Sequence, residues 1–229
     1  RRSSDLVYFD SCLSSITFRP DRGDHAARAD PVRRMTSAGR CPSAAASTTP
    51  PADLYVGSQH VSMADLSLDP EQLDRYSRHI IMDDIGPEGQ RRLLDANVLC
   101  IGAGGLGSPV LQYLAAAGVG TIGIADDDVV ERSNLQRQVV HADADVGRPK
   151  VDSAREFVER QNPDVDVRTH ETRVTADNVE SLLADYDIVV DGSDNFATRY
   201  LVNDACTLAG VPFSHGAILR FEGQVTTFE

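Results

Sequence analysis

Lysine is almost absent from this 229-residue chain: of its 22 basic residues, only Lys150 is a lysine. The four cysteines form no C-x-x-C pair, which excludes a zinc knuckle or a disulfide framework built from these residues. No apolar run approaches the roughly 18 residues of a membrane-spanning helix, and no stretch resembles the core of a signal peptide. We therefore predict a cytoplasmic protein that does not bind membranes.

Positive charge is also scarce, and it is unevenly distributed. The formal net charge is −13. Residues 1–62 carry 8 Arg and 6 Asp, net +2, whereas residues 63–229 carry 14 basic and 29 acidic residues, net −15. Because so acidic a domain repels phosphate backbones and acidic lipid surfaces, nucleic acid is not expected as a partner.

Composition divides the chain near Met63. Residues 1–62 have no sustained hydrophobic period and are rich in Ser, Ala, Pro, Arg and Asp. Such a segment is typical of a disordered linker, so we expect residues 1–62 to be a disordered or non-native extension. Residues 63–229 are long enough for one domain with a substantial core.

The central motif lies at residues 98–128. An apolar run at 98–101 predicts a buried strand, a glycine-rich turn follows, and residues 109–117 have a helical pattern. A second apolar run at 121–125 ends in three aspartates. This order of strand, glycine turn, helix, strand and acid is typical of a βαβ nucleotide-binding unit.

The rest of the chain continues the alternation of helices and strands. An N-terminal helical segment begins after Asp69, a plausible N-cap followed by Pro70. Gly86 and Pro87 are expected to break it. Further helices are predicted at 88–95, 149–161, 178–184 and 196–209, strands at 165–170, 187–191 and 211–214, and a hairpin or bent strand at 220–228. The fold class is therefore α/β, a Rossmann-like doubly wound, mainly parallel sheet.

The glycine turn GAGGLG contains Gly102, Gly104, Gly105 and Gly107. Glycines at this spacing permit a tight turn and close approach of the backbone, and the following helix N-terminus attracts phosphate. A tight strand–helix junction without a ligand would also favour glycine. Asp126, about 20 residues further on, is suited to hold a ribose.

Two more acids and a set of polar residues follow. Asp127 and Asp128 compete with Asp126 for the ribose, or simply form a solvated turn. Asn134, Arg137 and Lys150 suggest a polyphosphate, because cleavage of a polyphosphate needs cations that neutralise developing charge. A lysine in the first turn of a helix opposes the helix dipole, which favours a bound anion there. Arg148 is a rival for that role, and chance survival of one lysine is the alternative.

Two aspartates, Asp191 and Asp194, follow the strand predicted at 187–191. One carboxylate there can hold Mg²⁺ with phosphate oxygens completing the shell. The alternative is that Asp194 caps the helix that starts near Asn195. We predict Asp194 as the metal ligand. The histidines show no ligand spacing and receive no role.

Eight features together resemble one family: RYSRHI (75–80), GAGGLG (102–107), Asp126, SNLQRQ (133–138), VGRPK (146–150), DGSDN (191–195), TRYLVNDAC (198–206) and HGAILRFEGQVTTF (215–228). They look like the ubiquitin-activating-enzyme-like superfamily of ThiF, MoeB and HesA adenylyltransferases, and most of all like archaeal enzymes that activate the ubiquitin-like SAMP proteins. The resemblance covers residues 68–229.

The resemblance implies an ATP-dependent adenylyltransferase that works with Mg²⁺. A β-grasp ubiquitin-like or sulfur-carrier protein ending in Gly-Gly would attack the α-phosphate of ATP through its C-terminal carboxylate. An acyl-adenylate and pyrophosphate would result, for sulfur transfer or for protein conjugation. An NAD-dependent oxidoreductase and an inactive nucleotide-binding fragment are the alternatives.

The family motifs also assign residues. Gly105 would lie in the phosphate loop, Asp126 would hold the ribose, and Asp194 would bind Mg²⁺. Arg78 would reach the ATP of a neighbouring subunit, which implies a homodimer. The other nucleotide contacts implied are Asp128, Ser133, Asn134, Arg137, Lys150 and Asn195.

Relatives in the family continue with zinc-binding cysteine pairs and, in many, a reactive cysteine. Neither is present up to Glu229, so the family zinc site is absent from this chain, and we expect it to be the adenylation half of a longer protein. Cys100 and Cys206 match interior positions of the family and are expected to be core residues.

Overall fold

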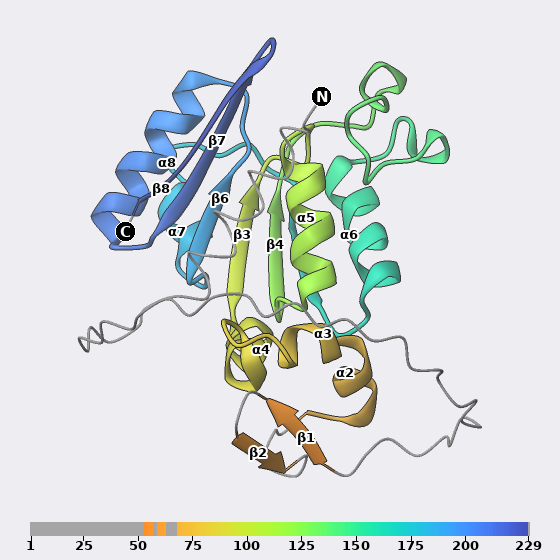
Figure 1. Cartoon of the computed structure of the whole chain (residues 1–229). Coiled ribbons are helices and arrows are strands. Elements are labelled where there is room, and N and C mark those ends of the chain that lie inside the picture. Colours follow the sequence, from red (N-terminus) through yellow and green to blue (C-terminus); the bar gives the residue numbers. More distant parts are fainter. Residues whose placement is uncertain (1–52, 57–58, 63–67, 229) are drawn as a thin grey trace.

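The computed structural model describes residues 53–56, 59–62 and 68–228 (Figure 1). Its helices are α2 (Pro70–Arg75), α3 (Ser77–Ile80), α4 (Gly86–Asp95), α5 (Gly107–Ala117), α6 (Lys150–Gln161), α7 (Val179–Leu183) and α8 (Phe196–Ala209). Its strands are β1 (Asp53–Val56), β2 (Gln59–Ser62), β3 (Asn97–Ile101), β4 (Thr121–Ala125), β5 (Asp166–His170), β6 (Ile188–Asp191), β7 (Phe213–Leu219) and β8 (Glu222–Phe228).

The first two strands form a small antiparallel pair of their own. They lie within the segment that the composition marks as an extension, and residues 1–52 of that segment lie outside the described residues. The division of the chain at residue 62 therefore stays a prediction.

The main sheet confirms the Rossmann-like prediction. It has six strands in the order β5-β4-β3-β6-β7-β8, and each neighbouring pair is parallel except β7 with β8. After β3 the chain builds outward through β4 and β5, then returns to build the other half from β6. The order of the strands thus reverses between β3 and β6, and in such sheets ligands bind beyond the carboxyl ends of the strands at this point.

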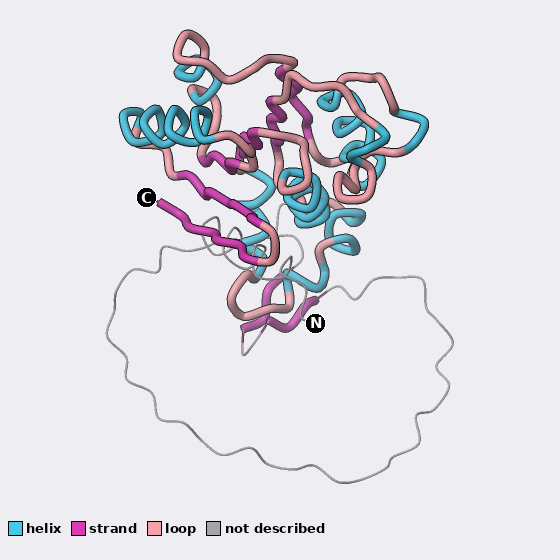
Figure 2. Tube along the Cα trace, turned by 90° about the horizontal axis from the view of Figure 1, so that it is seen from above, coloured by secondary structure: helices cyan, strands magenta, loops and turns pink. Residues whose placement is uncertain are grey.

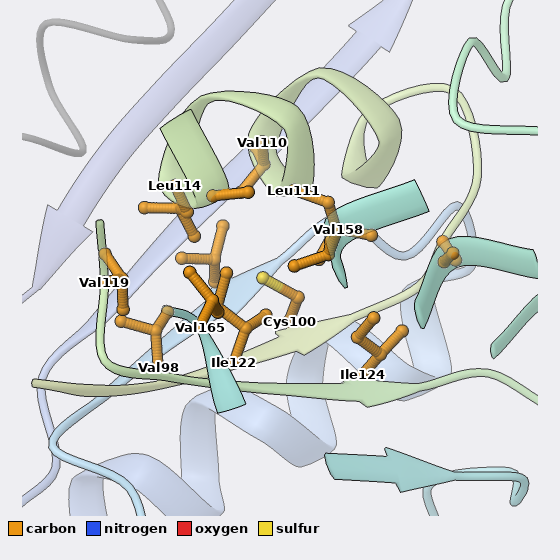
Figure 3. Close-up of a cluster of buried hydrophobic side chains, with 14 of the residues drawn as sticks. Val98, Cys100, Val110, Leu111, Leu114, Val119, Ile122, Ile124, Val158 and Val165 are labelled. Atoms are coloured by element: carbon orange, nitrogen blue, oxygen red, sulfur yellow. The ribbon is translucent and has the colours of Figure 1, made fainter. Parts of the chain in front are cut away.

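Helices cover both faces of this sheet, as the view from its carboxyl edge shows (Figure 2). On one face, α5 and α6 pack on β3 and β4 through a cluster that includes Val98, Cys100, Leu111, Ile122 and Val158 (Figure 3). On the other face, α7 and α8 pack against alternate residues of the same strands. A strand covered on both sides must be apolar throughout, which explains the unbroken run at 98–101.

The helix ends follow from local chemistry. Asp69 caps α2 and forms a capping box with Gln72, as its position predicted. Gly118 and Gly210 end α5 and α8 in the left-handed conformation. The prediction of a break at Gly86 and Pro87 was wrong, because α4 begins at Gly86. Proline is well tolerated in a first helical turn, where its missing N–H has no partner to lose.

The C-terminal part of the sheet is more extensive than predicted. Strand β7 runs to Leu219 rather than ending at Ser214, and it pairs with β8 over the whole length of a hairpin. A hairpin within residues 220–228 was expected, but residues 222–228 form the single strand β8 and Gly223 pairs regularly within it. The turn lies earlier, at Arg220 and Phe221, and joins β8 to β7. None of the described helices has the length and apolar character needed to cross a membrane.

The N-terminal helices lie at the opposite end of the sheet from the glycine turn (Figure 1). Tyr76, between α2 and α3, accepts a hydrogen bond from Asn162 at the end of α6. Its ring lies so close to Gly118 that a methyl group there would clash with it. Gln90 of α4 donates to the carbonyl of Ala117 at the end of α5. These contacts fasten the N-terminal helices to the C-terminal ends of α5 and α6.

Candidate functional site

A pocket of about 840 Å³ opens at the carboxyl ends of β3, β4 and β6. The three polar clusters that follow these strand ends in the sequence all contribute to its lining, as predicted from the parallel sheet. The predicted site residues that line it are Gly102, Gly104, Gly105, Asp126, Asp128, Arg137, Lys150, Asp194 and Asn195.

The glycines of the turn have different tasks. Gly102 has a φ of 89°, which other residues rarely adopt, and it packs against the backbone of Gly192 after β6. Gly107 does not line the pocket. A methyl group on Gly107 would lie 1.8 Å from the carbonyl oxygen of Gly102, so this glycine is required for closing the turn. Gly104 and Gly105 line the pocket together with Gly102 and have no comparably close backbone contact.

Asp126 stands at the end of β4 with its carboxylate turned back to the turn. One oxygen accepts the N–H of Ala103 at 2.8 Å and the other accepts the N–H of Asp128 at 2.9 Å. Burial raises the pKa of Asp126 above its usual value, while these two backbone donors and nearby Lys150 act in the opposite direction. The side chain is therefore fixed in orientation at the pocket wall.

Lys150 is the first residue of α6, and only 5% of its surface is exposed. Its ammonium lies 2.7 Å from an oxygen of Asp128 and 4.0 Å from one of Asp126. The sequence argument favoured a bound anion as the reason for this lysine, and the structure adds a partner within the chain. The Asp128 side chain is largely exposed, so its pairing with Lys150 can be exchanged for another anion at little cost.

Three carboxylates, those of Asp126, Asp127 and Asp128, have oxygens within 4.8 Å of one another. Carboxylates so placed are compatible with a cation. Two of these three side chains already have partners, however: backbone N–H groups in the case of Asp126, and Lys150 in the case of Asp128.

Arg137 is exposed and lies over the glycine turn, its methylene groups next to Gly105. Asn134 accepts a hydrogen bond of 2.9 Å from the Arg137 guanidinium, and Ser133 donates to Glu131. Neither Asn134 nor Ser133 lines the pocket. The structure thus places Asn134 behind Arg137, as a residue that holds the guanidinium in position.

The loop after β6 separates two aspartates by environment. Asp191 is fully buried, accepts the N–H of Ser193 and is hydrogen-bonded to His215. Asp194 is exposed in the pocket wall, and within the described residues its carboxylate has neither a hydrogen bond nor an ion pair. Of the two, only Asp194 has oxygens available to a ligand.

The alternative role for Asp194, as a helix cap, is ruled out. Because α8 begins at Phe196, its N-cap is Asn195, whose side-chain oxygen accepts the N–H of Thr198 at 2.9 Å. The side-chain oxygen of Asn195 is thus engaged in the cap, and its predicted contact with the nucleotide stays a prediction. The cap does not use the amide nitrogen of the Asn195 side chain.

Arg78 is exposed on α3, away from the pocket of its own chain. The contacts of the N-terminal helices with the far ends of α5 and α6 place it at the other end of the sheet (Figure 1). Within one chain, the structure therefore does not bring Arg78 together with the other predicted site residues.

Several lining residues were missed by the sequence reasoning. Thr172 and Arg173 follow β5, and the rule that polar residues gather after parallel strands would have found them. Arg199 donates two hydrogen bonds to the carbonyl of Ser193 and so fixes the loop that carries Asp194. Gln138 is buried beside Gly104, with a side-chain oxygen that has no partner among the described residues. Gln138 is the last residue of the SNLQRQ motif, so the motif indicated its position, but its burial beside the turn could not be read from the sequence.

The two cysteines in the described residues are buried, as predicted. Burial raises the pKa of the Cys206 thiol to about 11, with the carboxylate of Asp191 acting in the same direction. A thiol of that kind is a poor nucleophile at neutral pH, so Cys206 belongs to the core.

Comparison with known proteins gives a consistent result. A model of the ThiF family matches residues 76–229. Over 162 residues the chain is 64% identical to the SAMP-activating enzyme E1 of Haloferax volcanii, covering 71% of this chain and 60% of that protein. It is 59% identical over 162 residues to the probable adenylyltransferase/sulfurtransferase MoeZ of Mycobacterium tuberculosis, covering 71% of this chain and 41% of that one. The chain thus spans about half the length of these curated relatives.

Among solved structures, a similar one is the E. coli tRNA N6-threonylcarbamoyladenosine dehydratase TcdA in complex with ATP. The TM-score is 0.62 at 25% sequence identity, over 66% of this chain and 64% of that one.

Proposed function

The chain belongs to the ThiF family, and from that premise we propose that it is the adenylylating part of an ATP-dependent adenylyltransferase. Its substrate is the C-terminal carboxylate of a ubiquitin-like or sulfur-carrier protein. The observation that carries the proposal is one pocket lined by the glycine turn, by the cations of Arg137 and Lys150, and by the carboxylate of Asp194, which has no partner among the described residues.

ATP would lie across the carboxyl ends of β3 and β4. The phosphates would contact the backbone of Gly104 and Gly105, because these glycines face the pocket and the N-terminus of α5 adds a favourable dipole. The fixed carboxylate of Asp126 is suited to accept hydrogen bonds from the ribose hydroxyls. Gly102 supports this arrangement by its close packing.

The cations would neutralise the charge that develops on the leaving pyrophosphate. Lys150 would exchange Asp128 for a phosphate oxygen, since its ammonium is buried at the pocket wall and its partner is exposed. Arg137, hydrogen-bonded to Asn134, would bind the phosphates from the solvent-exposed side of the pocket. The roles assigned to Ser133 and Asn195 by the family motif are retained as proposals, through backbone or amide groups.

Asp194 fits the Mg²⁺ that the family implies. It offers one carboxylate that has no partner within the described part of the chain, and Mg²⁺ characteristically takes one or two carboxylates together with phosphate oxygens and water. When bound, Mg²⁺ would add positive charge next to the phosphates. The chain's own contribution is to hold the Asp194 loop in place through Arg199 and the Asn195 cap.

The reaction needs no general base. An oxygen of the carrier's C-terminal carboxylate, ionised at neutral pH, forms a bond to the α-phosphorus of ATP. The bond between that phosphorus and the oxygen bridging to the β-phosphate breaks, and pyrophosphate leaves with the electron pair. The products are an acyl-adenylate and pyrophosphate, and the protein contributes alignment and charge neutralisation.

The partner would be a β-grasp protein ending in Gly-Gly. The names of the two relatives, a SAMP-activating enzyme and an adenylyltransferase/sulfurtransferase, support protein conjugation and sulfur transfer as the two downstream routes. A homodimer would explain Arg78, which lies far from its own pocket and would reach the ATP of a neighbouring subunit. We expect the protein in the cytoplasm.

Exchange of labelled pyrophosphate into ATP tests the proposal, measured with and without a carrier that ends in Gly-Gly. We expect exchange that depends on the carrier and is lost when the carrier's last glycine is removed. ATP binding without exchange would indicate a nucleotide-binding fragment. Reduction of NAD without exchange would instead indicate an oxidoreductase.

A further inference from the structure

Ala103 lies at the centre of the glycine turn, and its backbone N–H and carbonyl both have side-chain hydrogen-bond partners. The N–H of Ala103 donates to Asp126 at 2.8 Å. The carbonyl of Ala103 lies 3.0 Å from Nε2 of His141. Ala103 itself is fully buried, so these two side chains replace water as its hydrogen-bonding partners.

His141 is buried, with 7% of its surface exposed, and it does not line the pocket. A carbonyl oxygen can only accept a hydrogen bond, so the proton must be on Nε2. The other nitrogen, Nδ1, lies 2.9 Å from the hydroxyl of Ser153, which also lies 2.9 Å from Asp145. The Ser153 hydroxyl has one proton, so it can donate either to Nδ1 or to Asp145, and not to both at once. The contact that defines the orientation of the ring is therefore the one from Nε2 to the Ala103 carbonyl.

Burial lowers the pKa of His141 below its usual value. The charge of Lys150 acts in the same direction, while the Ala103 carbonyl, Asp126 and Asp145 act against it. At neutral pH the ring is thus uncharged, and its single proton is the one donated to Ala103.

Fixing this carbonyl also fixes the N–H that follows it. The described residues contain no cis peptide bond, and in a trans peptide the carbonyl and the next N–H point in opposite directions. When the Ala103 carbonyl points to buried His141, the Gly104 N–H points away from it. Gly104 lines the pocket, and within the described part of the chain its N–H has no hydrogen-bond partner.

We propose that His141 is a positioning residue that orients the Ala103–Gly104 peptide, so that the Gly104 N–H faces the pocket and donates to a phosphate of ATP. The inference rests on the proposed function, because it assigns that N–H to ATP. Ser153 and Lys150 belong to the same helix, α6. The contacts of His141 with Ala103 and with Ser153 therefore connect the glycine turn to α6, which carries the lysine that would bind the same phosphates.

Two substitutions of His141 distinguish the contributions of its two ring nitrogens. The amide nitrogen of glutamine reaches about the position of Nε2, so His141→Gln keeps a donor for Ala103. The amide of asparagine reaches only the position of Nδ1, so His141→Asn keeps a partner for Ser153 and loses the one for Ala103. His170→Asn is the matched control, because His170 bonds Tyr186 and does not line the pocket.

ATP affinity is measured by calorimetry on the wild-type chain and these variants, alongside urea unfolding. We expect His141→Asn to bind ATP about tenfold or more weakly, the usual effect of losing one hydrogen bond to a charged group. His141→Gln and His170→Asn should bind close to wild type. Equal affinity of the Asn and Gln variants would overturn the role of His141 and leave the proposed function intact. No ATP binding by the wild-type chain would overturn both.

Nitrogen-15 NMR of the wild-type chain tests the same inference without any substitution. We expect a proton on Nε2 of His141 and a large shift of the Gly104 amide when ATP is added. A proton on Nδ1 instead, or a Gly104 amide that does not respond to bound ATP, would contradict the inference.

Discussion

The two sides of the pocket differ in how far the chain itself satisfies their polar groups. On the buried side, Asp126, His141 and Lys150 each have partners within the chain and little exposed surface. On the open side, Arg137 and Asp194 are exposed, and within the described residues Asp194 has no partner.

This difference follows from the cost of desolvation. A buried charge or amide must be paired, or folding loses several kcal/mol, whereas an exposed group is solvated by water. Substitutions on the buried side should therefore change stability and function together. Substitutions on the open side should change function alone.

The largest effect is expected at the turn that joins both sides. In Gly107→Ala the new methyl group would meet the backbone oxygen of Gly102 at 1.8 Å, and neither atom can move without opening the turn. We expect a loss of about 3 kcal/mol or more in the free energy of unfolding, measured by urea denaturation.

Gly104→Ala is the matched control for that substitution. Its methyl group would meet only the side chain of Gln138, at an ordinary contact distance of 3.7 Å. This variant should fold like wild type and bind ATP more weakly, because Gly104 lines the pocket. A stable Gly107→Ala variant would show that the turn is not closed as described.

Lys150→Arg tests the buried side. The charge is kept, but a planar guanidinium does not fit the buried space of an ammonium. We expect carrier-dependent pyrophosphate exchange to fall about 100- to 1,000-fold and the unfolding midpoint to drop. Arg155→Lys, at a half-buried position of the same helix whose partner is Asp152, should change neither. Wild-type exchange in Lys150→Arg would make the single lysine an accident of composition.

Asp194→Asn tests the open side. Because the carboxylate is exposed and unpaired among the described residues, the unfolding midpoint should stay at its wild-type value. Exchange at limiting Mg²⁺ should fall about 10- to 100-fold and recover in part at high Mg²⁺. Asp204→Asn on the outside of α8 is the control. A large loss of stability in Asp194→Asn would remove the distinction between the two sides.

The smallest effect is the pH dependence of stability, expected from the buried side. Burial lowers the pKa of His141 in the folded chain below the value of 6.5 that applies when it is unfolded. As the pH falls below 6.5, the unfolded chain therefore takes up a proton that the folded chain does not, and stability decreases. His170 acts in the same direction.

Urea denaturation at pH 7.5 and 5.5 measures this dependence. The decrease in stability between these pH values should be smaller in His141→Gln than in wild type. An identical decrease in the two proteins would show that His141 does not titrate differently in the folded chain.

Much of the fold could be predicted because it depends on local patterns. The apolar run at 98–101 and the helix ends at Gly118 and Gly210 need no knowledge of distant residues. The error at Gly86 arose because a glycine–proline pair can end one helix or begin the next, and the sequence does not distinguish the two. The length of β7 was underestimated because its last residues are exposed and are held by pairing with β8 rather than by burial.

The sequence predicted where the pocket lies more accurately than it predicted which atoms within the pocket contact one another. Strand ends that meet at one edge of a sheet explain why the glycine turn, Asp126 and Asp194 share a pocket. The residues after β5 were missed because β5 is only partly buried and its end is less marked. The capping bond of Asn195 to Thr198 was not predicted, because it depends on where α8 begins.

The sequence by itself determined the βαβ unit, the doubly wound sheet, the family and the position of the pocket, because hydrophobic period and turn chemistry act over a few residues. Only the tertiary structure decided which groups within the pocket are already paired. Lys150 meets Asp128 across 22 residues, and His141 meets Ala103 across 38. Hydrogen bonds depend on distance and direction between atoms, and those are fixed only when distant segments pack together.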